Sequence, residues 1–229
     1  MRKRIIALIS FLCYIVCWTQ AADEHYYFKN LSIKDGLSQT TVNAIMQDKK
    51  GFMWFGTKGG LSRYDGMSFR NFKRDMNDNH SLGNNFVTCL YEDNKGNIWV
   101  GTDAGMYIYY SDREIFVPFN LLSRENTKID RTVSAISGDK EGRVWIAVET
   151  QGLFCYEPQK EQLHNYTLNS FSANVQSVTS DNSGTIWVGF YGSGLFYSKD
   201  NLKTLHPYLS PKDGEEVFKD DVIMKIVPG

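Results

Sequence analysis

The sequence predicts an all-β fold, a β-propeller of four-stranded blades, and two observations lead to this prediction. First, an Asp-x-x-Gly turn followed three residues later by Trp occurs four times, with the Trp residues 45, 46 and 42 residues apart. These residues are Trp54, Trp99, Trp145 and Trp187. Second, a short β-like run ending in Gly and an aromatic residue follows each Trp. A period of roughly 40–50 residues is that of a four-stranded propeller blade.

The repeats divide residues 22–229 into four complete blades and the start of a fifth. The four blades span about residues 37–82, 83–128, 129–172 and 173–220. The fifth begins at Asp221 with an apolar run that resembles the start of the other copies. We therefore expect a partial propeller.

The first strand of each repeat alternates apolar residues with small or polar ones. Its third residue is always small: Ala44, Cys89, Ala135 and Ser177. A small side chain suits the crowded position next to a propeller axis. We therefore expect Cys89 to be a buried free thiol, although an exported protein permits a disulfide with Cys155.

The Asp-x-x-Gly sequence is typical of a hairpin turn. Asp accepts hydrogen bonds from the backbone N–H groups ahead of it, and Gly supplies the positive φ that closes a type I turn with a bulge. The turn residues are Asp48, Gly51, Asp93, Gly96, Asp139, Gly142, Asp181 and Gly184. Calcium is the alternative ligand for such a turn, but it needs six to eight oxygens and the equivalent positions of other copies hold Lys. We expect no metal and no other cofactor.

The second strand is apolar on both faces in every repeat, as in Ile98–Val100 and Val144–Ile146. Continuous apolar residues indicate a strand that is covered on both sides, which blades packed face to face provide. A Trp stripe could instead form a sugar-stacking platform. Because the four Trp residues recur at one register inside these strands, we predict that they are structural core.

The N-terminus has the pattern of a secretory signal peptide, residues 1–21, which we expect to be helical. Basic Met1–Arg4 precedes the apolar run Ile5–Trp18, and Ala21 offers a small residue for cleavage. The run is about 14 residues long, shorter than the roughly 20 that cross a bilayer. An uncleaved anchor is the alternative. With 25 basic and 26 acidic residues in the chain, we expect no nucleic-acid partner.

Several of these motifs together resemble the two-component-regulator propeller repeat. Gly36–Ser38 precedes the first strand, and Gly56-Thr57 and Gly60-Leu61 follow Trp54. The third copy departs from the pattern with Ala147-Val148, and the fourth with Gly189-Phe190. The resemblance covers about residues 26–229.

This resemblance implies the N-terminal part of the periplasmic sensor region of a hybrid two-component histidine kinase in the inner membrane. Its partners would be the rest of the same polypeptide, namely further blades, a transmembrane helix and a kinase, and the whole protein is expected to be a homodimer. Four blades do not close the seven-bladed ring of that family. The segment Tyr26–Leu31 resembles an outer strand that would complete the last blade.

The resemblance further implies an oligosaccharide ligand released from complex glycans. Propeller geometry places a binding site at the loops between second and third strands, where the copies differ. The candidate ligand-binding residues are Lys58, Asp103, Glu149, Gln151 and Tyr191. The alternative interpretation is that these are solvent-exposed loop side chains that bind no ligand.

Two other functional classes remain open. A propeller-type glycan-active enzyme, such as a sialidase or a lyase, needs two positioned carboxylates, and the sequence pairs none among Glu92, Glu149 and Glu161. A structural or protein-interaction propeller is the third class. We expect no catalysis in this segment.

Overall fold

The computed structural model describes residues 28–121, 128–166, 174–209, 214–215, 217–218 and 221–227. The chain forms two compact units, Met1–Leu31 and Ser32–Gly229. The expected signal peptide and residues 26–27 of the expected outer strand lie outside the described residues, and residues 28–31 form no strand. Among the helices in the described ranges, none has both the length and the apolar character needed to cross a membrane.

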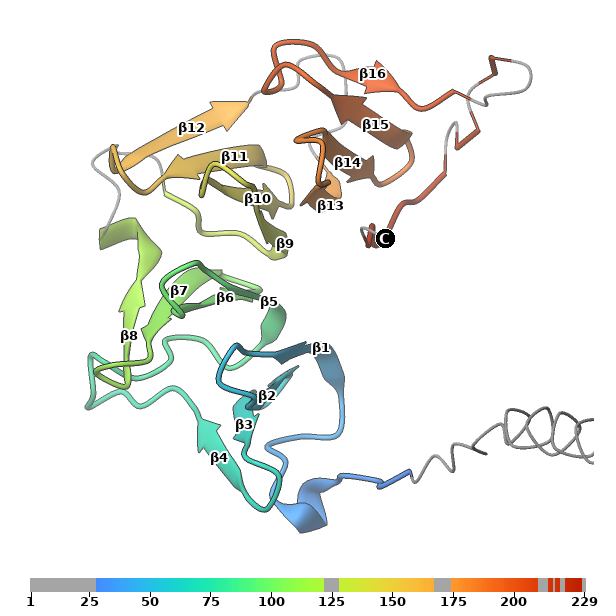
Figure 1. Ribbon diagram of the computed structural model, residues 1–229. Helices are drawn as coiled ribbons and strands as arrows, with labels where there is room; N and C mark the ends of the chain where they lie inside the picture. The colour runs from blue at the N-terminus through green and yellow to red at the C-terminus, as the bar shows by residue number, and fades with distance from the viewer. Residues whose placement is uncertain are drawn as a thin grey trace, which may run out of the picture. The chain divides into compact units, whose positions relative to one another are not determined.

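Within its described residues, the unit Ser32–Gly229 holds four antiparallel sheets of four strands, each built from strands consecutive in sequence (Figure 1). Blade 1 consists of β1 (Val42–Gln47), β2 (Met53–Thr57), β3 (Gly60–Tyr64) and β4 (Phe69–Phe72). Blade 2 consists of β5 (Val87–Glu92), β6 (Ile98–Thr102), β7 (Gly105–Tyr110) and β8 (Ile115–Pro118). Blade 3 consists of β9 (Val133–Gly138), β10 (Val144–Val148), β11 (Gly152–Glu157) and β12 (Gln162–Tyr166). Blade 4 consists of β13 (Val175–Ser180), β14 (Ile186–Phe190), β15 (Gly194–Ser198) and β16 (His206–Pro207).

Two short 3-10 helices flank these strands, η1 (Ile33–Asp35) before blade 1 and η2 (Phe119–Leu121) after β8. Ser32 caps η1, accepting from the backbone N–H of Lys34, while the Asp35 carboxylate accepts from the Ser32 N–H. This reciprocal arrangement is a capping box. The sequence prediction of four-stranded propeller blades is confirmed.

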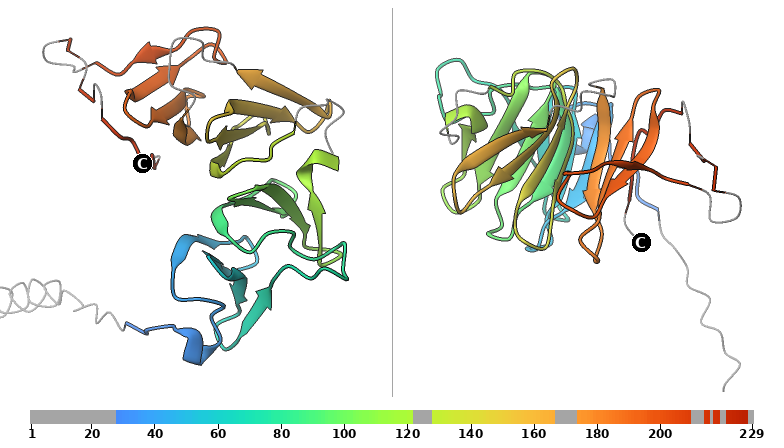
Figure 2. Two further views of the ribbon diagram at one scale, coloured as in Figure 1. Left: turned by 180° about the vertical axis from the view of Figure 1, so that it is seen from behind. Right: turned by 90° about the horizontal axis from the view of Figure 1, so that it is seen from above.

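The first strands of successive blades lie side by side, β1 against β5, β5 against β9 and β9 against β13 (Figure 2). A bulge near the start of each first strand shifts its register against the second strand. In blades 1 to 3 the side chain of the bulged residue donates a hydrogen bond to a backbone carbonyl of the next blade. The bonds are Asn43 Nδ2 to Val87 O (2.8 Å), Thr88 Oγ1 to Val133 O (2.6 Å) and Ser134 Oγ to Val175 O (2.6 Å). An unpaired bulge residue thus links neighbouring blades.

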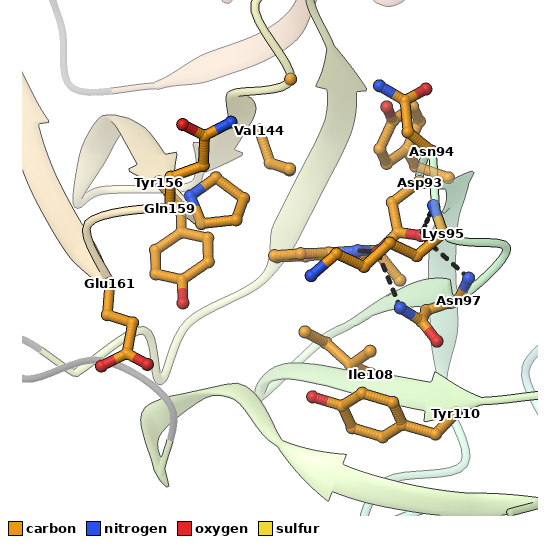
Figure 3. Close-up of a pocket in the computed structure, with 14 residues that line it drawn as sticks. Asp93, Asn94, Lys95, Asn97, Ile108, Tyr110, Val144, Tyr156, Gln159 and Glu161 are labelled. Carbon is orange, nitrogen blue, oxygen red and sulfur yellow. Dashed lines mark hydrogen bonds between the residues drawn. The ribbon is translucent and has the colours of Figure 1, made fainter. Parts of the chain in front are cut away.

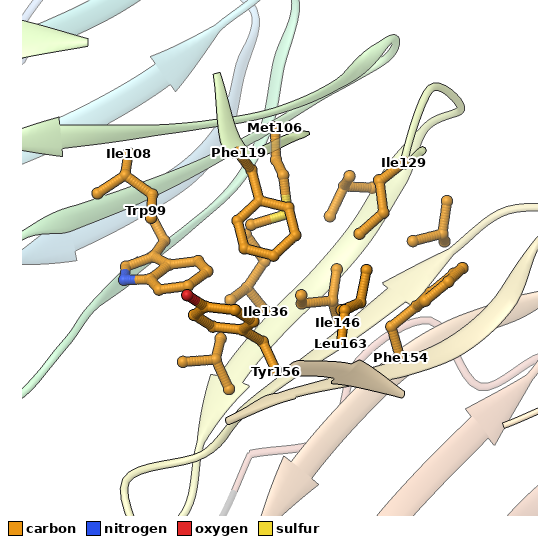
Figure 4. Packing of buried hydrophobic residues seen from close by; sticks show 13 residues of the cluster. Trp99, Met106, Ile108, Phe119, Ile129, Ile136, Ile146, Phe154, Tyr156 and Leu163 are labelled. Atoms are coloured by element: carbon orange, nitrogen blue, oxygen red, sulfur yellow. The ribbon is translucent and has the colours of Figure 1, made fainter. Parts of the chain in front are cut away.

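Apolar cores fill the spaces between successive blades. Figure 4 shows the core between blades 2 and 3, where the Trp99 ring packs 5.6 Å from the Phe119 ring and 5.8 Å from that of Tyr156. Trp54 and Trp145 are buried equally deeply in the neighbouring cores. Trp187 of blade 4 is only half-buried, because it borders a cleft over that blade.

A glycine in the second strand makes room for the blade that follows. A Cβ atom at Gly56 would lie 2.6 Å from Val87 Cγ1, and one at Gly189 would lie 2.6 Å from Ile223 Cγ2. Such distances are too short for real contacts. Ile223 therefore holds the place beside blade 4 that Val87 holds beside blade 1, and it lies in the segment where the sequence predicts a fifth repeat.

Candidate functional site

One end of each blade, which we call the turn end, carries the same hydrogen-bonded hairpin. Asp48 Oδ1 accepts from the backbone N–H of Lys50 (3.0 Å) and Phe52 (2.9 Å), while its Oδ2 accepts from Trp54 Nε1 (2.7 Å). The same indole bond recurs from Trp99 to Asp93 (3.1 Å), from Trp145 to Asp139 (2.8 Å) and from Trp187 to Asp181 (2.9 Å). Each Asp thus ties its turn to the core of the second strand.

The turn glycine closes this hairpin with a φ of 90° at Gly51 and between 77° and 86° at Gly96, Gly142 and Gly184. In blade 4 the Ser183 hydroxyl, the Trp187 indole and two backbone N–H groups hold the pKa of Asp181 far below its ordinary value. Each of these groups donates to the ionised carboxylate and stabilises its charge. In blade 4 the turn is therefore a structural feature built around a charged side chain.

The opposite end of each blade, the loop end, carries the five residues predicted to bind a ligand. Four of them occupy one equivalent position, since each backbone N–H donates to the residue just before the first strand of its own blade. The bonds run from Lys58 to Thr41, Asp103 to Phe86, Glu149 to Thr132 and Tyr191 to Asn174. Gln151 lies two residues further along the blade 3 loop and donates to the Lys128 carbonyl (3.0 Å).

These five side chains differ in their surroundings. Lys58 is exposed and its Nζ lies 5.4 Å from the centre of the Phe86 ring. Asp103 and Tyr191 are exposed, whereas Glu149 and Gln151 are half-buried. The loop end therefore displays a cation, two carboxylates, an amide and a phenol, one or two from each blade.

A groove of about 520 Å³ runs along the first strands of the four blades. Glu149 lines it together with Thr88, Ser134, Gln176 and Lys225. The other four loop-end candidates are not among its lining residues. The groove thus combines hydroxyl, amide, carboxylate and ammonium groups that can bind hydroxyls of a ligand, and the structure brings Glu149 alone of the five into it.

Two cysteines lie in the described part of the chain: Cys155 is buried, whereas Cys89 is only half-buried and lines the groove. Cys89 and Cys155 are free thiols, and Cys89 Sγ donates to the Val133 carbonyl (3.4 Å). Loss of solvation raises the pKa of both thiols to about 12, which leaves them unreactive at neutral pH. In the ranges that the structure describes, His, Cys, Asp and Glu form no group of three that could hold a metal ion.

Comparison with known proteins gives a sequence match and a structural match. Residues 36–59 and 81–104 match the family model described as the two component regulator propeller. A stretch of 77 residues is 36% identical to Histidine kinase P4 of Formosa agariphila. These residues make up 34% of this chain and 5% of that protein. The chain thus spans a small part of this relative.

Solved structures that share the fold include an extracellular domain and a lyase. The extracellular domain of a putative hybrid two component system from B. thetaiotaomicron matches with a TM-score of 0.71 and 24% identity, over 83% of this chain and 27% of that one. Virginiamycin B lyase from Staphylococcus aureus matches with a TM-score of 0.60 and 13% identity, over 81% of this chain and 60% of the lyase. The fold therefore occurs both in an extracellular domain of a putative hybrid two component system and in a lyase, so the fold alone does not decide the function of this chain.

Proposed function

We propose that this chain, which carries two-component-regulator propeller repeats, is the N-terminal part of the periplasmic sensor region of a hybrid two-component system. The observation that carries the proposal is the match of blades 1 and 2 to the repeat model, at the residues that build the Asp turn, the second strand and the loop after it. The likeness of the blades to extracellular sensor domains agrees with it. The rest of the same polypeptide would complete the propeller, cross the inner membrane and act as the kinase.

The ligand we propose is an oligosaccharide derived from a glycan, whose binding regulates the downstream kinase in a homodimer. The loop end supports this, because Lys58, Asp103 and Tyr191 present polar and aromatic groups from different blades at one equivalent position. Polar groups that both donate and accept suit sugar hydroxyls, and an exposed ring suits a sugar face. We propose neither a nucleic-acid partner nor a cofactor.

We propose no catalysis within this segment. The three acidic residues that a glycosidase mechanism could use have separate surroundings: Glu92 accepts from the Lys49 N–H of blade 1 (2.9 Å), Glu149 lines the groove, and Glu161 lies in the turn that joins β11 and β12. Glycoside cleavage generally depends on two carboxyl groups held at one glycosidic bond.

A thermal-shift screen tests the proposed function. The purified chain is heated with and without neutral and acidic oligosaccharides, and a ligand at 100 times its Kd stabilises the folded state by about 2.7 kcal/mol. That corresponds to a rise in Tm of several degrees. Sugar alcohols of equal concentration control for solvent effects. Unchanged Tm with every saccharide would contradict glycan sensing by this segment.

A further inference from the structure

A cleft of about 390 Å³ opens between blades 2 and 3 at the turn end, away from the loop-end candidates. Figure 3 shows its two walls: Asn94, Lys95 and Tyr110 come from blade 2, and Gln159 and Glu161 from blade 3. The floor is mainly apolar and contains the buried residues Trp99, Ile108 and Tyr156.

An arginine covers the corresponding Trp in the two neighbouring blades. In blade 1, Arg63 lies opposite Trp54 in the sheet, with its guanidinium 4.6 Å from the Phe52 ring and 5.7 Å from that of Trp54. The same arginine reaches Glu114 of blade 2 (3.7 Å). Arg63 thus covers one ring system and spans the gap to the next blade.

Blade 3 uses a different arginine for the same purpose. Arg143, four residues after Asp139, lies 5.4 Å from the Trp145 ring and donates to Asp139 Oδ2 (2.7 Å). Its side chain is only 17% exposed, so it fills the space beside that indole. A cation packed on an indole face in this way is a favourable contact.

Blade 2 has neither arginine. Ile108 lies opposite Trp99, where blade 1 has Arg63, and Asn97 holds the place of Arg143. Asn97 Nδ2 still donates to Asp93 Oδ2 (3.0 Å), but the amide is too short to extend over the indole. The cleft therefore lies where blade 2 has neither the Arg63 of blade 1 nor the Arg143 of blade 3.

We propose that this cleft binds a neutral sugar residue of the oligosaccharide. This proposal rests on the proposed function and gives that ligand a site at the turn end, separate from the loop-end residues. A sugar ring has an apolar C–H face that can pack on the half-buried ring of Tyr110, and it has hydroxyl groups for the rim, where Asn94, Lys95, Gln159 and Glu161 are all exposed. Lys95 and Glu161 carry opposite charges on facing walls, so the rim suits groups that both donate and accept rather than an anion. The volume is that of a small-ligand pocket.

The indole N–H of Trp99 reports directly on this site, because it donates to Asp93 within the cleft. The ¹⁵N-labelled chain is titrated with neutral di- to tetrasaccharides of glucose, galactose, mannose and xylose. We expect one of them to shift the Trp99 indole signal and to leave those of Trp54 and Trp145 in place. A shift of the Trp187 signal alone would assign binding to blade 4 and overturn the proposal.

Asn97→Arg gives blade 2 the arginine of blade 3 and closes the cleft. We expect it to weaken binding of that saccharide at least tenfold, while Thr185→Arg, the same register position in blade 4, binds like the unsubstituted chain. Lys95→Ala, with Lys50→Ala at the same turn position of blade 1 as its control, removes a rim donor without filling the cleft and should weaken binding severalfold. These exposed lysines can be replaced without disturbing the core.

The outcomes separate the two proposals. If no saccharide shifts any indole signal or raises the Tm, the proposed function fails and this site fails with it. If a saccharide binds but Asn97→Arg and Lys95→Ala bind it unchanged, glycan sensing survives and the cleft is not its site.

Discussion

At the turn end all four blades use the same atoms, whereas at the loop end each blade presents a different side chain. Every turn-end Asp bonds two backbone N–H groups and one indole, with indole bonds of 2.7 to 3.1 Å. At the loop end, Lys58, Asp103, Glu149 and Tyr191 share only a backbone hydrogen bond. The difference separates residues that hold a blade together from residues whose side chains are free to differ between blades.

The largest effect should come from removing a turn-end indole. Trp145→Ala deletes a side chain that is 0% exposed and leaves the Asp139 carboxylate without one donor, so we expect a loss of about 3–5 kcal/mol in the free energy of unfolding. Urea denaturation followed by circular dichroism measures it. Tyr191→Ala at the loop end, where the ring is 56% exposed, should change stability by less than about 0.5 kcal/mol. Equal losses from both substitutions would contradict the distinction between the two ends.

A smaller loss should follow from adding one methyl group between blades 2 and 3. A Cβ at Gly101 would lie 2.4 Å from Cys89 Sγ and 3.0 Å from Val133 Cγ1, so Gly101→Ala should cost about 1–3 kcal/mol. In blade 3 the same pair is Ala147 opposite Ala135.

The chain therefore offers its own compensating variant. Cys89→Ala combined with Gly101→Ala recreates the pair of blade 3 and should recover most of the lost stability in the same urea experiment. If the double variant is no more stable than Gly101→Ala, the contact with Cys89 is not the cause of the loss.

The fold was predictable from the sequence because the repeated residues are also the structural ones. The spacing of 45, 46 and 42 residues between Trp54, Trp99, Trp145 and Trp187 is the length of one blade. The Gly of each turn marks the hairpin between the first and second strands. The indole bond to Asp was missed, although a fixed six-residue separation of Asp and Trp was its signal. In each blade the Asp before the hairpin turn accepts a hydrogen bond from the indole six residues later.

The sites were less predictable because they depend on residues that the repeat does not fix. The loop-end residues lie where the sequences of the copies differ, yet Glu149 alone of them lines the groove. The cleft between blades 2 and 3 is lined by Asn97 and Ile108, whereas Arg63 and Arg143 lie beside the corresponding Trp residues of blades 1 and 3. The sequence alone does not say which side chain lies opposite each Trp, because that depends on the strand register.

The pH dependence of stability should distinguish the two ends as well. The native state holds the pKa of Asp181 below its ordinary value, so its stabilisation is present at neutral pH and is lost as the pH falls through the acid range. Asp181→Asn should lower stability by about 1–2 kcal/mol at pH 7. The difference from the unsubstituted chain should shrink below about pH 4, as the carboxylate of the unfolded chain becomes protonated.

Asp103→Asn is the matched control at the loop end, where the carboxylate is exposed. Its effect on the urea midpoint should be small at pH 7 and at pH 3. A difference between Asp181→Asn and the unsubstituted chain that stays constant from pH 7 to pH 3 would mean that the charge of Asp181 does not stabilise the turn.

The smallest effect on stability should come from Glu149→Gln, which removes one charge from the groove and keeps the shape of the side chain. Because the backbone N–H of residue 149 still donates to the Thr132 carbonyl (2.9 Å), we expect the free energy of unfolding to change by less than about 0.5 kcal/mol. The same substitution also tests whether the saccharide binds in the groove or in the cleft. Saccharide affinity that falls with Glu149→Gln and not with Lys95→Ala assigns recognition to the loop end, and the reverse result assigns it to the turn end, where the blades are otherwise alike.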